Sequence, residues 1–224
     1  MIGSLVDEAD GSSLVDPTPS RKIDGTVYVM RHGRTSLDVQ HRSDGWLDLP
    51  LSDEGQLELI GSQQALKTVP IAKIYAPDLK RTTETADLVQ SGLLSSPKIV
   101  VDDNAKTWNL GVLAGTKKRY GRPEVQKLVA DPTRAPLGGE SYNTFVSRFL
   151  PWFTKIGKEA VKSGKPVLVV CSGSNLRLLG EHLLGDQDAI DLTEGGLAAL
   201  HYSGGSWGGE VIRGHEDDSE NESA

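Results

Sequence analysis

Apolar residues gather into short runs of the kind that form buried strands. Four such runs, each three or four residues long and mostly β-branched or aliphatic, cover residues 27–30, 72–75, 99–101 and 167–170. Each run is followed by turn-forming or polar residues, which favours strands over helices. Two later runs, 197–202 and 207–212, are separated by a Ser-Gly-Gly turn and predict a terminal hairpin.

Between these runs, apolar residues recur at helical spacing. Ser52 precedes two acids, which is a helix-start signal, and Pro70 ends the same segment. We expect this helix to have an apolar face made by Leu57, Ile60, Ala65, Leu66 and Val69. A second helix is predicted over 78–90, with Arg81 in its first turn.

Two more helices are predicted in the second half of the chain. The first is marked by core residues at helical spacing: Phe145, Phe149, Phe153, Ile156 and Ala160. Pro151 lies inside this pattern and predicts a kink or a break. The second covers 175–184 and ends at Gly185. Residues 102–139 contain three prolines and predict a loop-rich segment.

Strands that alternate with helices predict an α/β fold. We expect a three-layer α/β/α sandwich with a mainly parallel sheet, formed by one domain over residues 25–213. Residues 1–24 are rich in Ser, Asp, Gly and Pro and predict a flexible acidic leader, and residues 214–224 predict an acidic tail.

Composition narrows the class of protein. The formal net charge of −7 comes from the two ends, since each carries five acids while the domain between them is close to neutral. No basic patch suggests nucleic-acid binding, and no apolar stretch approaches the roughly 20 residues that span a membrane. The acidic N-terminal segment lacks the features of a signal peptide. The single cysteine, Cys171, suits a reducing compartment. We therefore expect a cytoplasmic protein.

The first strand leads into the sequence Arg31-His32-Gly33-Arg34-Thr35. Ligands of α/β proteins bind at the carboxyl ends of strands, and Gly33 permits a sharp turn there. Guanidinium groups bind phosphate through paired hydrogen bonds, and a neutral imidazole is a competent nucleophile. These residues indicate a phosphate site.

This strand-RHG-x-T pattern resembles the signature of the histidine phosphatase superfamily, the phosphoglycerate-mutase-like enzymes. Three further segments match the family in order, namely DLPLSDEG at 48–55, APDLKRTTETA at 76–86 and GGES at 138–141. The resemblance implies hydrolysis of a small phosphorylated substrate without metal or cofactor.

The resemblance also implies roles for individual residues. His32 would be the nucleophile that forms a phosphohistidine, and Ser172 stands at the second catalytic position. Arg31 and Arg81 would bind the phosphate, together with Thr35 and Gly173.

Three positions depart from the family pattern. Ser172 stands where the family has its second histidine, and Thr107 stands where it usually has a proton-donating glutamate. Asp38 replaces a frequent asparagine and brings an acid near the phosphate. We therefore expect weakened activity, and the alternative is a catalytically lapsed phospho-ligand-binding or assembly module of the same fold. A mutase is less favoured, because it needs the full donor set.

Other interpretations stay open at this point. Cys171 to Arg177 forms a C-x5-R pattern, which is typical of cysteine phosphatases, although a buried structural cysteine fits as well. His201 could replace the missing histidine only if its strand end reaches the pocket. The sequence leaves the substrate and the oligomeric state undetermined.

Overall fold

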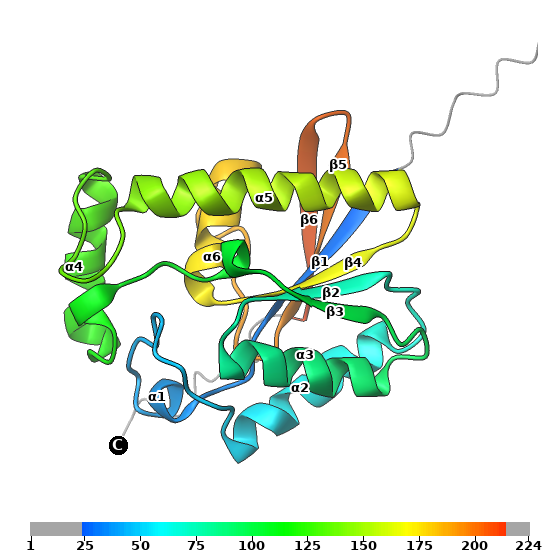
Figure 1. Cartoon of the computed structure of the whole chain (residues 1–224), viewed down its shortest axis with the longest axis horizontal. Coiled ribbons are helices and arrows are strands. Elements are labelled where there is room, and N and C mark those ends of the chain that lie inside the picture. The colour runs from blue at the N-terminus through cyan, green and yellow to red at the C-terminus, as the bar shows by residue number, and fades with distance from the viewer. Residues whose placement is uncertain (1–23, 214–224) are drawn as a thin grey trace, which may run out of the picture.

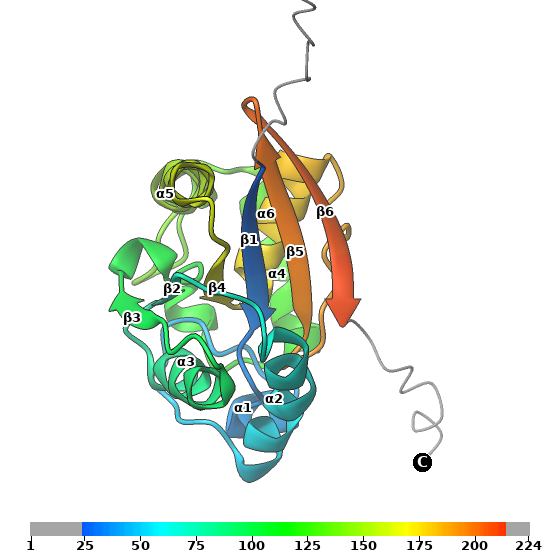
Figure 2. The ribbon, with the colours of Figure 1, turned by 90° about the vertical axis from the view of Figure 1, so that its right-hand side faces the viewer.

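A six-stranded sheet in the order β3-β2-β4-β1-β5-β6 separates two helical layers (Figures 1 and 2). The computed structural model describes residues 24–213, so the predicted tail and nearly all of the predicted leader lie outside the described residues. The strands are β1 (Gly25–Arg31), β2 (Lys73–Ala76), β3 (Lys98–Val101), β4 (Val167–Cys171), β5 (Leu197–Ser203) and β6 (Ser206–Arg213).

The pairing confirms the mainly parallel sheet. Strand β1 runs parallel to β4, and β2 runs parallel to both β4 and β3. The terminal β5–β6 hairpin is antiparallel, as predicted, and its Gly204–Gly205 turn has positive φ at both residues. The β1–β4 register places Arg31 opposite Cys171. The two strands therefore deliver the segments after them to the same edge of the sheet.

Helices cover both faces of the sheet, which confirms the three-layer α/β fold (Figure 2). Their bounds are α1 Ser36–Val39, α2 Asp53–Leu66, α3 Lys80–Gly92, α4 Lys118–Ala130, α5 Tyr142–Ser163 and α6 Gly173–Leu179. Alternation along β4 divides the core, because Val167 and Val169 pack in the same cluster as α5 whereas Leu168 and Val170 pack with α2 and α3. No helix within residues 24–213 is long and apolar enough to cross a membrane.

The predicted apolar face of α2 is partly wrong. Leu57 and Ile60 are 65% and 50% exposed, while Gly55, Leu59, Ser62 and Leu66 are buried. The buried residues recur at helical spacing but include a serine and a glycine, so the hydrophobic pattern identified Leu66 correctly and placed Leu57 and Ile60 on the wrong side of the helix.

Three other helix predictions need correction. The loop-rich segment contains α4, a 13-residue helix that includes Pro123. The sequence predicts a kink or a break at Pro151. The break is wrong, because α5 continues through this exposed residue. Helix α6 begins at Gly173, two residues before the predicted start. It is followed by a π-helical turn, Gly180–Leu184, and Gly185, which has positive φ, ends this turn as predicted.

Candidate active site

The predicted nucleophile lies at the carboxyl edge of the parallel strands. The His32 amide donates to the Cys171 carbonyl oxygen at 3.0 Å, which ties the segment after β1 to the end of β4. Gly33 is required by close packing, since a Cβ there would lie 2.2 Å from the Gly55 carbonyl oxygen of α2. Backbone contacts with two elements therefore fix the position of His32.

The His32 imidazole is buried, with 3% of its surface exposed, and both ring nitrogens have partners. Nδ1 lies 2.9 Å from the Gly33 carbonyl oxygen, and Arg81 Nε lies 3.2 Å from Nε2. Because the guanidinium can only donate, Nε2 is the acceptor and Nδ1 carries the proton. Burial, followed by the charge of Arg81, lowers the His32 pKa to about 3. The ring is neutral at physiological pH, with its Nε2 lone pair directed at Arg81.

Arg81 belongs to the first turn of α3 and is fully buried. Its Nη1 and Nη2 donate to the carbonyl oxygens of Leu47 and Gly45 at 2.8 and 2.7 Å. Burial lowers its pKa, but a guanidinium stays charged in proteins. The loop after α1 thus orients the cation that faces His32.

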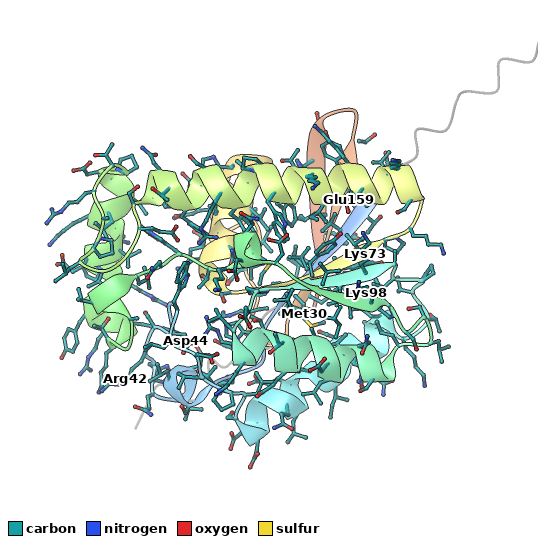
Figure 3. All side chains as sticks on the ribbon, viewed as in Figure 1. Met30, Arg42, Asp44, Lys73, Lys98 and Glu159 are labelled. Carbon is teal, nitrogen blue, oxygen red and sulfur yellow. The ribbon has the colours of Figure 1, made fainter. Side chains whose placement is uncertain are left out.

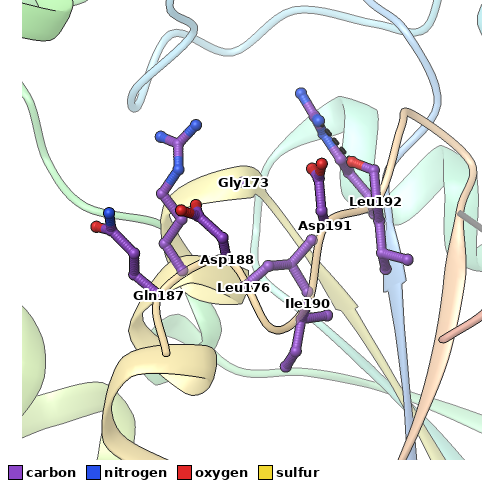
Figure 4. A pocket seen from close by; sticks show the side chains of 9 residues that line it. Gly173, Leu176, Gln187, Asp188, Ile190, Asp191 and Leu192 are labelled. Atoms are coloured by element: carbon purple, nitrogen blue, oxygen red, sulfur yellow. Dashed lines mark hydrogen bonds between the residues drawn. The ribbon is translucent and has the colours of Figure 1, made fainter. Parts of the chain in front are cut away.

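Arg31 approaches from the end of β1. Its guanidinium donates to the Leu192 carbonyl oxygen at 2.7 Å and forms an ion pair with Glu194. A Cβ placed on Gly173 would lie 3.9 Å from Arg31 Cζ, so these two predicted phosphate ligands are neighbours. Both line a cavity of about 50 Å³, whose lining also includes Asp188 and Asp191 (Figure 4).

Acidic residues form the least expected part of the site. Asp38 accepts from Lys118 Nζ at 3.1 Å, and Asp44 lies 3.8 Å from Arg81 Nε. Together with Glu194, these acids give three carboxylates against the three cations Arg31, Arg81 and Lys118. The sequence drew attention only to Asp38. Asp44, Lys118 and Glu194 carry no signal of their own in the sequence, since each belongs to the site only through long-range folding.

The two aspartates titrate in opposite directions. Burial opposes ionisation of Asp38, but the charge that His32 gains in acid, followed by the charge of Lys118 and the Thr35 amide, outweighs burial and holds the Asp38 pKa below its usual range. For Asp44, burial and then the charge of Asp38 raise the pKa to about 6, against the opposing effect of Arg81. Asp44, labelled in Figure 3, lies at the start of α1, since its Oδ1 is 3.0 Å from the hydroxyl of Thr35, the N-cap residue of that helix.

Thr35 is fully buried between these acids. Its hydroxyl caps α1 by accepting from the amides of Leu37 and Asp38, and it lies 3.2 Å from Asp38 Oδ2 and 3.0 Å from Asp44 Oδ1. These contacts give Thr35 a clear structural task. Its role as a phosphate ligand stays a prediction.

The substituted positions are also buried. Ser172 follows β4 as the cap of α6, and its amide donates to Asn175 Oδ1 at 3.1 Å. The Thr107 carbonyl oxygen accepts from Trp46 Nε1 and Arg148 Nη2, both at 2.7 Å. A threonine hydroxyl does not serve as a general acid near neutral pH, so Thr107 does not supply the acid of this site.

Two alternative nucleophile or donor assignments lose their support. His201 pairs with Thr26 at the start of β1, about 16 Å along the strand from Arg31. Its Nδ1 contacts the Thr26 hydroxyl, so it does not reach His32. Cys171 is buried in the core beneath α5, and burial raises the pKa of its thiol. A buried, protonated thiol is a structural cysteine, which argues against a cysteine phosphatase.

One group of possible metal ligands occurs among residues 24–213. Ligand atoms of His32, Asp38 and Asp44 all lie within 4.8 Å of one another. However, His32 Nε2 accepts from Arg81, and Lys118 already pairs with Asp38. A divalent cation here would meet two fixed positive charges at short range, so this donor set does not fit a metal.

A shallow apolar cleft adjoins the site. It measures about 440 Å³ and is lined by Trp46, Leu47, Asn109, Gly111, Val112, Ala114, Leu137 and Gly138. Leu47 connects this cleft to the charged centre, because its carbonyl oxygen accepts from Arg81.

The fold is an α/β fold that carries a buried His-Arg pair at the carboxyl ends of its parallel strands. The model of the histidine phosphatase superfamily (branch 1) matches residues 27–212, and the chain belongs to this superfamily. The family predicted from the sequence is thereby confirmed.

Individual relatives agree with this assignment. A 2,3-bisphosphoglycerate-dependent phosphoglycerate mutase of Methanosarcina mazei is 28% identical, with 87% of this chain and 95% of the relative covered. The crystal structure of a phosphoglycerate mutase from Bacillus anthracis has a TM-score of 0.72 at 27% identity, with 85% of this chain and 93% of that chain covered. A mycobacterial glucosyl-3-phosphoglycerate phosphatase has the same fold, with a TM-score of 0.67 at 22% identity and coverage of 85% and 100%.

Proposed function

We propose that the protein hydrolyses small phosphomonoesters through a phosphoryl intermediate on Nε2 of His32. The observation that carries this proposal is the fixed tautomer of His32, with Nδ1 held by the Gly33 carbonyl oxygen and Nε2 left as the lone-pair nitrogen. An imidazole nucleophile needs this arrangement, and burial keeps it neutral over the physiological pH range.

The neighbouring cations suit the charge that develops during phosphoryl transfer. Catalysis of this reaction rests mainly on positioning and charge stabilisation, with little covalent work by other groups. Arg31 and Arg81 approach the nucleophile from β1 and α3. Substrate must insert between Arg81 and His32, because the 3.2 Å contact between them occupies the lone pair at rest. Water then attacks the phosphohistidine and releases phosphate.

Hydrolysis is favoured over mutase activity by the substitutions. Shuttling a phosphoryl group between two positions of a substrate needs both the second histidine and the acid of the family, and Ser172 and Thr107 provide neither. Loss of one preorganised donor costs on the order of 10²–10³ in rate, so we expect slow turnover. We further propose a cytoplasmic location, which the single buried cysteine supports.

A second candidate is a phospho-ligand-binding module without turnover. It is favoured by the balance of charge, because each of the three cations already has a carboxylate partner. A phosphate dianion must displace these partners. In this case the pocket would bind phosphate or its analogue vanadate without chemistry.

Hydrolysis of a panel of phosphomonoesters between pH 5 and 8 tests the proposal. We expect slow release of phosphate that His32→Asn abolishes and that Cys171→Ser, its control outside the site, leaves nearly intact. Vanadate or phosphate at ~100 times its dissociation constant should stabilise the fold by about 2.7 kcal/mol in either candidate. Stabilisation without any turnover would establish the binding module. A protein that shows no turnover and no stabilisation by phosphate or vanadate would contradict both candidates.

A further inference from the structure

The site lacks an evident proton donor for the leaving group. Thr107 stands at the expected position of the acid but carries only a hydroxyl. A leaving alkoxide or phenoxide needs a proton, and general acids typically accelerate its departure by about 10²–10⁴. Any replacement must be a titratable group close to His32. Among residues 24–213, Asp38 and Asp44 each have an oxygen within 4.8 Å of a His32 ring nitrogen and of each other.

Hydrogen bonding around Thr35 distinguishes the two acids. The Thr35 hydroxyl has one proton, yet it contacts Asp38 Oδ2 at 3.2 Å and Asp44 Oδ1 at 3.0 Å. Asp38 is satisfied as a carboxylate, since it also accepts from the Thr35 amide and from Lys118 Nζ. Asp44 has no lysine partner within the part of the chain that the structure describes, and Arg81 Nε lies 3.8 Å away, beyond hydrogen-bond distance. If the cluster holds one proton besides that of the Thr35 hydroxyl, Asp44 is therefore the carboxyl group that binds it.

We propose that Asp44 is the general acid of this site, holding a proton beside His32 and delivering it to the leaving oxygen of the substrate. This inference rests on the proposed phosphatase function. It assigns the proton-donor role to a residue of the loop after α1, a different element from the segment of Thr107.

The groups that face Asp44 support this assignment. They are Arg81 of α3, Asp38 of α1, the Thr35 hydroxyl and His32, while Lys118 of α4 acts on Asp38. Burial and the negative Asp38 raise the pKa of Asp44 to about 6, so the carboxyl group keeps its proton in mildly acidic solution. The protonated form of Asp44, which can donate a proton, is therefore present below about pH 6 and is lost as the pH rises through this value.

The geometry is compatible with proton delivery. A reacting phosphorus lies about 3 Å from its nucleophile, with the leaving oxygen beyond it. The acid must lie on the Nε2 side of the ring to reach that oxygen, and Arg81 Nε, which is 3.2 Å from His32 Nε2 and 3.8 Å from Asp44 Oδ2, places the Asp44 carboxyl on this side. Arg81, which contacts both His32 and Asp44, can bind the phosphoryl oxygens between them.

The two steps balance. Nε2 of His32 forms a bond to phosphorus as the bond to the leaving oxygen breaks, and the Asp44 proton passes to that oxygen, which gives an alcohol and an Asp44 carboxylate. Water then attacks phosphorus, and the carboxylate takes a proton from this water. The nitrogen–phosphorus bond breaks, so phosphate, neutral His32 and protonated Asp44 are restored.

Leaving-group dependence tests the proposal. Wild type and Asp44→Asn are compared on aryl phosphates from 2,4-dinitrophenyl, which leaves without a proton, to phenyl, which needs one. We expect Asp44→Asn to lower kcat on phenyl phosphate by ~10²-fold or more and on the dinitrophenyl ester by less than ~10-fold. Adding Thr107→Glu to Asp44→Asn should restore part of the phenyl phosphate activity. An equal loss on all esters, or no loss, would overturn the role of Asp44 as an acid.

Two further measurements keep the proposal testable. Asp38→Asn removes the charge that raises the Asp44 pKa, so the falling limb of kcat against pH on phenyl phosphate should move to lower pH; an unmoved limb contradicts the proposal. Infrared difference spectra should show a protonated carboxyl band at pH 5 that is lost at pH 8 and in Asp44→Asn, and absence of this band also contradicts it. If the wild-type protein does not measurably hydrolyse even the dinitrophenyl ester, the proposed function itself is overturned, whatever the infrared result.

Discussion

At His32, burial and a neighbouring guanidinium act in the same direction. Both oppose a positive charge on the ring, and the pKa falls to about 3. A neutral nucleophile is therefore available at any pH at which the protein is expected to work. Changes of rate between pH 5 and 8 should come from other groups, above all from Asp44.

Ser172 offers a direct test of the weakened site. A serine hydroxyl donates one neutral hydrogen bond, whereas an imidazolium donates a charge-assisted one that is roughly twice as strong. Such a donor acts mainly where charge develops in the transition state. We expect Ser172→His to raise kcat on an activated aryl phosphate by ~10-fold or more with little change in KM, as measured by steady-state kinetics.

The outcome also depends on the neighbours of Ser172. Asn175 holds the Ser172 amide, so Ser172→Ala serves as a matched variant that keeps this backbone contact. A folded Ser172→His protein with unchanged or lower kcat would mean that another group already stabilises the phosphoryl oxygens.

The sequence predicts some residues of the site far better than others. His32, Arg31 and Arg81 stand in motifs at strand or helix ends, and the structure brings His32 and Arg81 into contact. Asp44 and Glu194 are isolated acids in loops, and only long-range folding places them beside arginines. The charge balance of the pocket therefore could not be predicted from local patterns.

Among the elements, α2 shows the limit of hydrophobic pattern. Leu57 and Leu59 are two residues apart and equally apolar, but only Leu59 is buried against the sheet. We expect Leu59→Ala to lower the free energy of unfolding by about 2–5 kcal/mol. The matched Leu57→Ala should change it by less than about 0.5 kcal/mol. Urea denaturation measures both, and similar losses would contradict the orientation of this helix.

Helices α4 and α5 differ in how they could be predicted. Helix α4 is rich in Lys and Arg, contains Pro123 and buries only Gly121 and Leu128, so its apolar signal is short and is outweighed by the proline. Helix α5 has a strong pattern, with three buried phenylalanines spaced four residues apart. Packing of this face against the sheet stabilises the helix through Pro151, which lies on the exposed side.

At the scale of the molecule, the sheet explains why distant segments meet. The carboxyl ends of β1 and β4 lie side by side, and the loops and helices that follow the strands place Arg31, His32, Arg81 and Gly173 at one edge. Strand alternation made this α/β arrangement predictable. The antiparallel β5–β6 hairpin closes the other side of β1 and leaves His201 far from the site.

The central claim is a covalent phosphoryl group on His32. Rapid quenching in base during turnover of a dinitrophenyl phosphate, followed by peptide mass spectrometry, tests it most directly. The expected product is a base-stable, acid-labile phosphohistidine at His32 that is absent in His32→Asn and retained in Cys171→Ser. Hydrolysis with no phosphorylated protein at any time, or a label on Cys171 that survives His32→Asn, would contradict the claim.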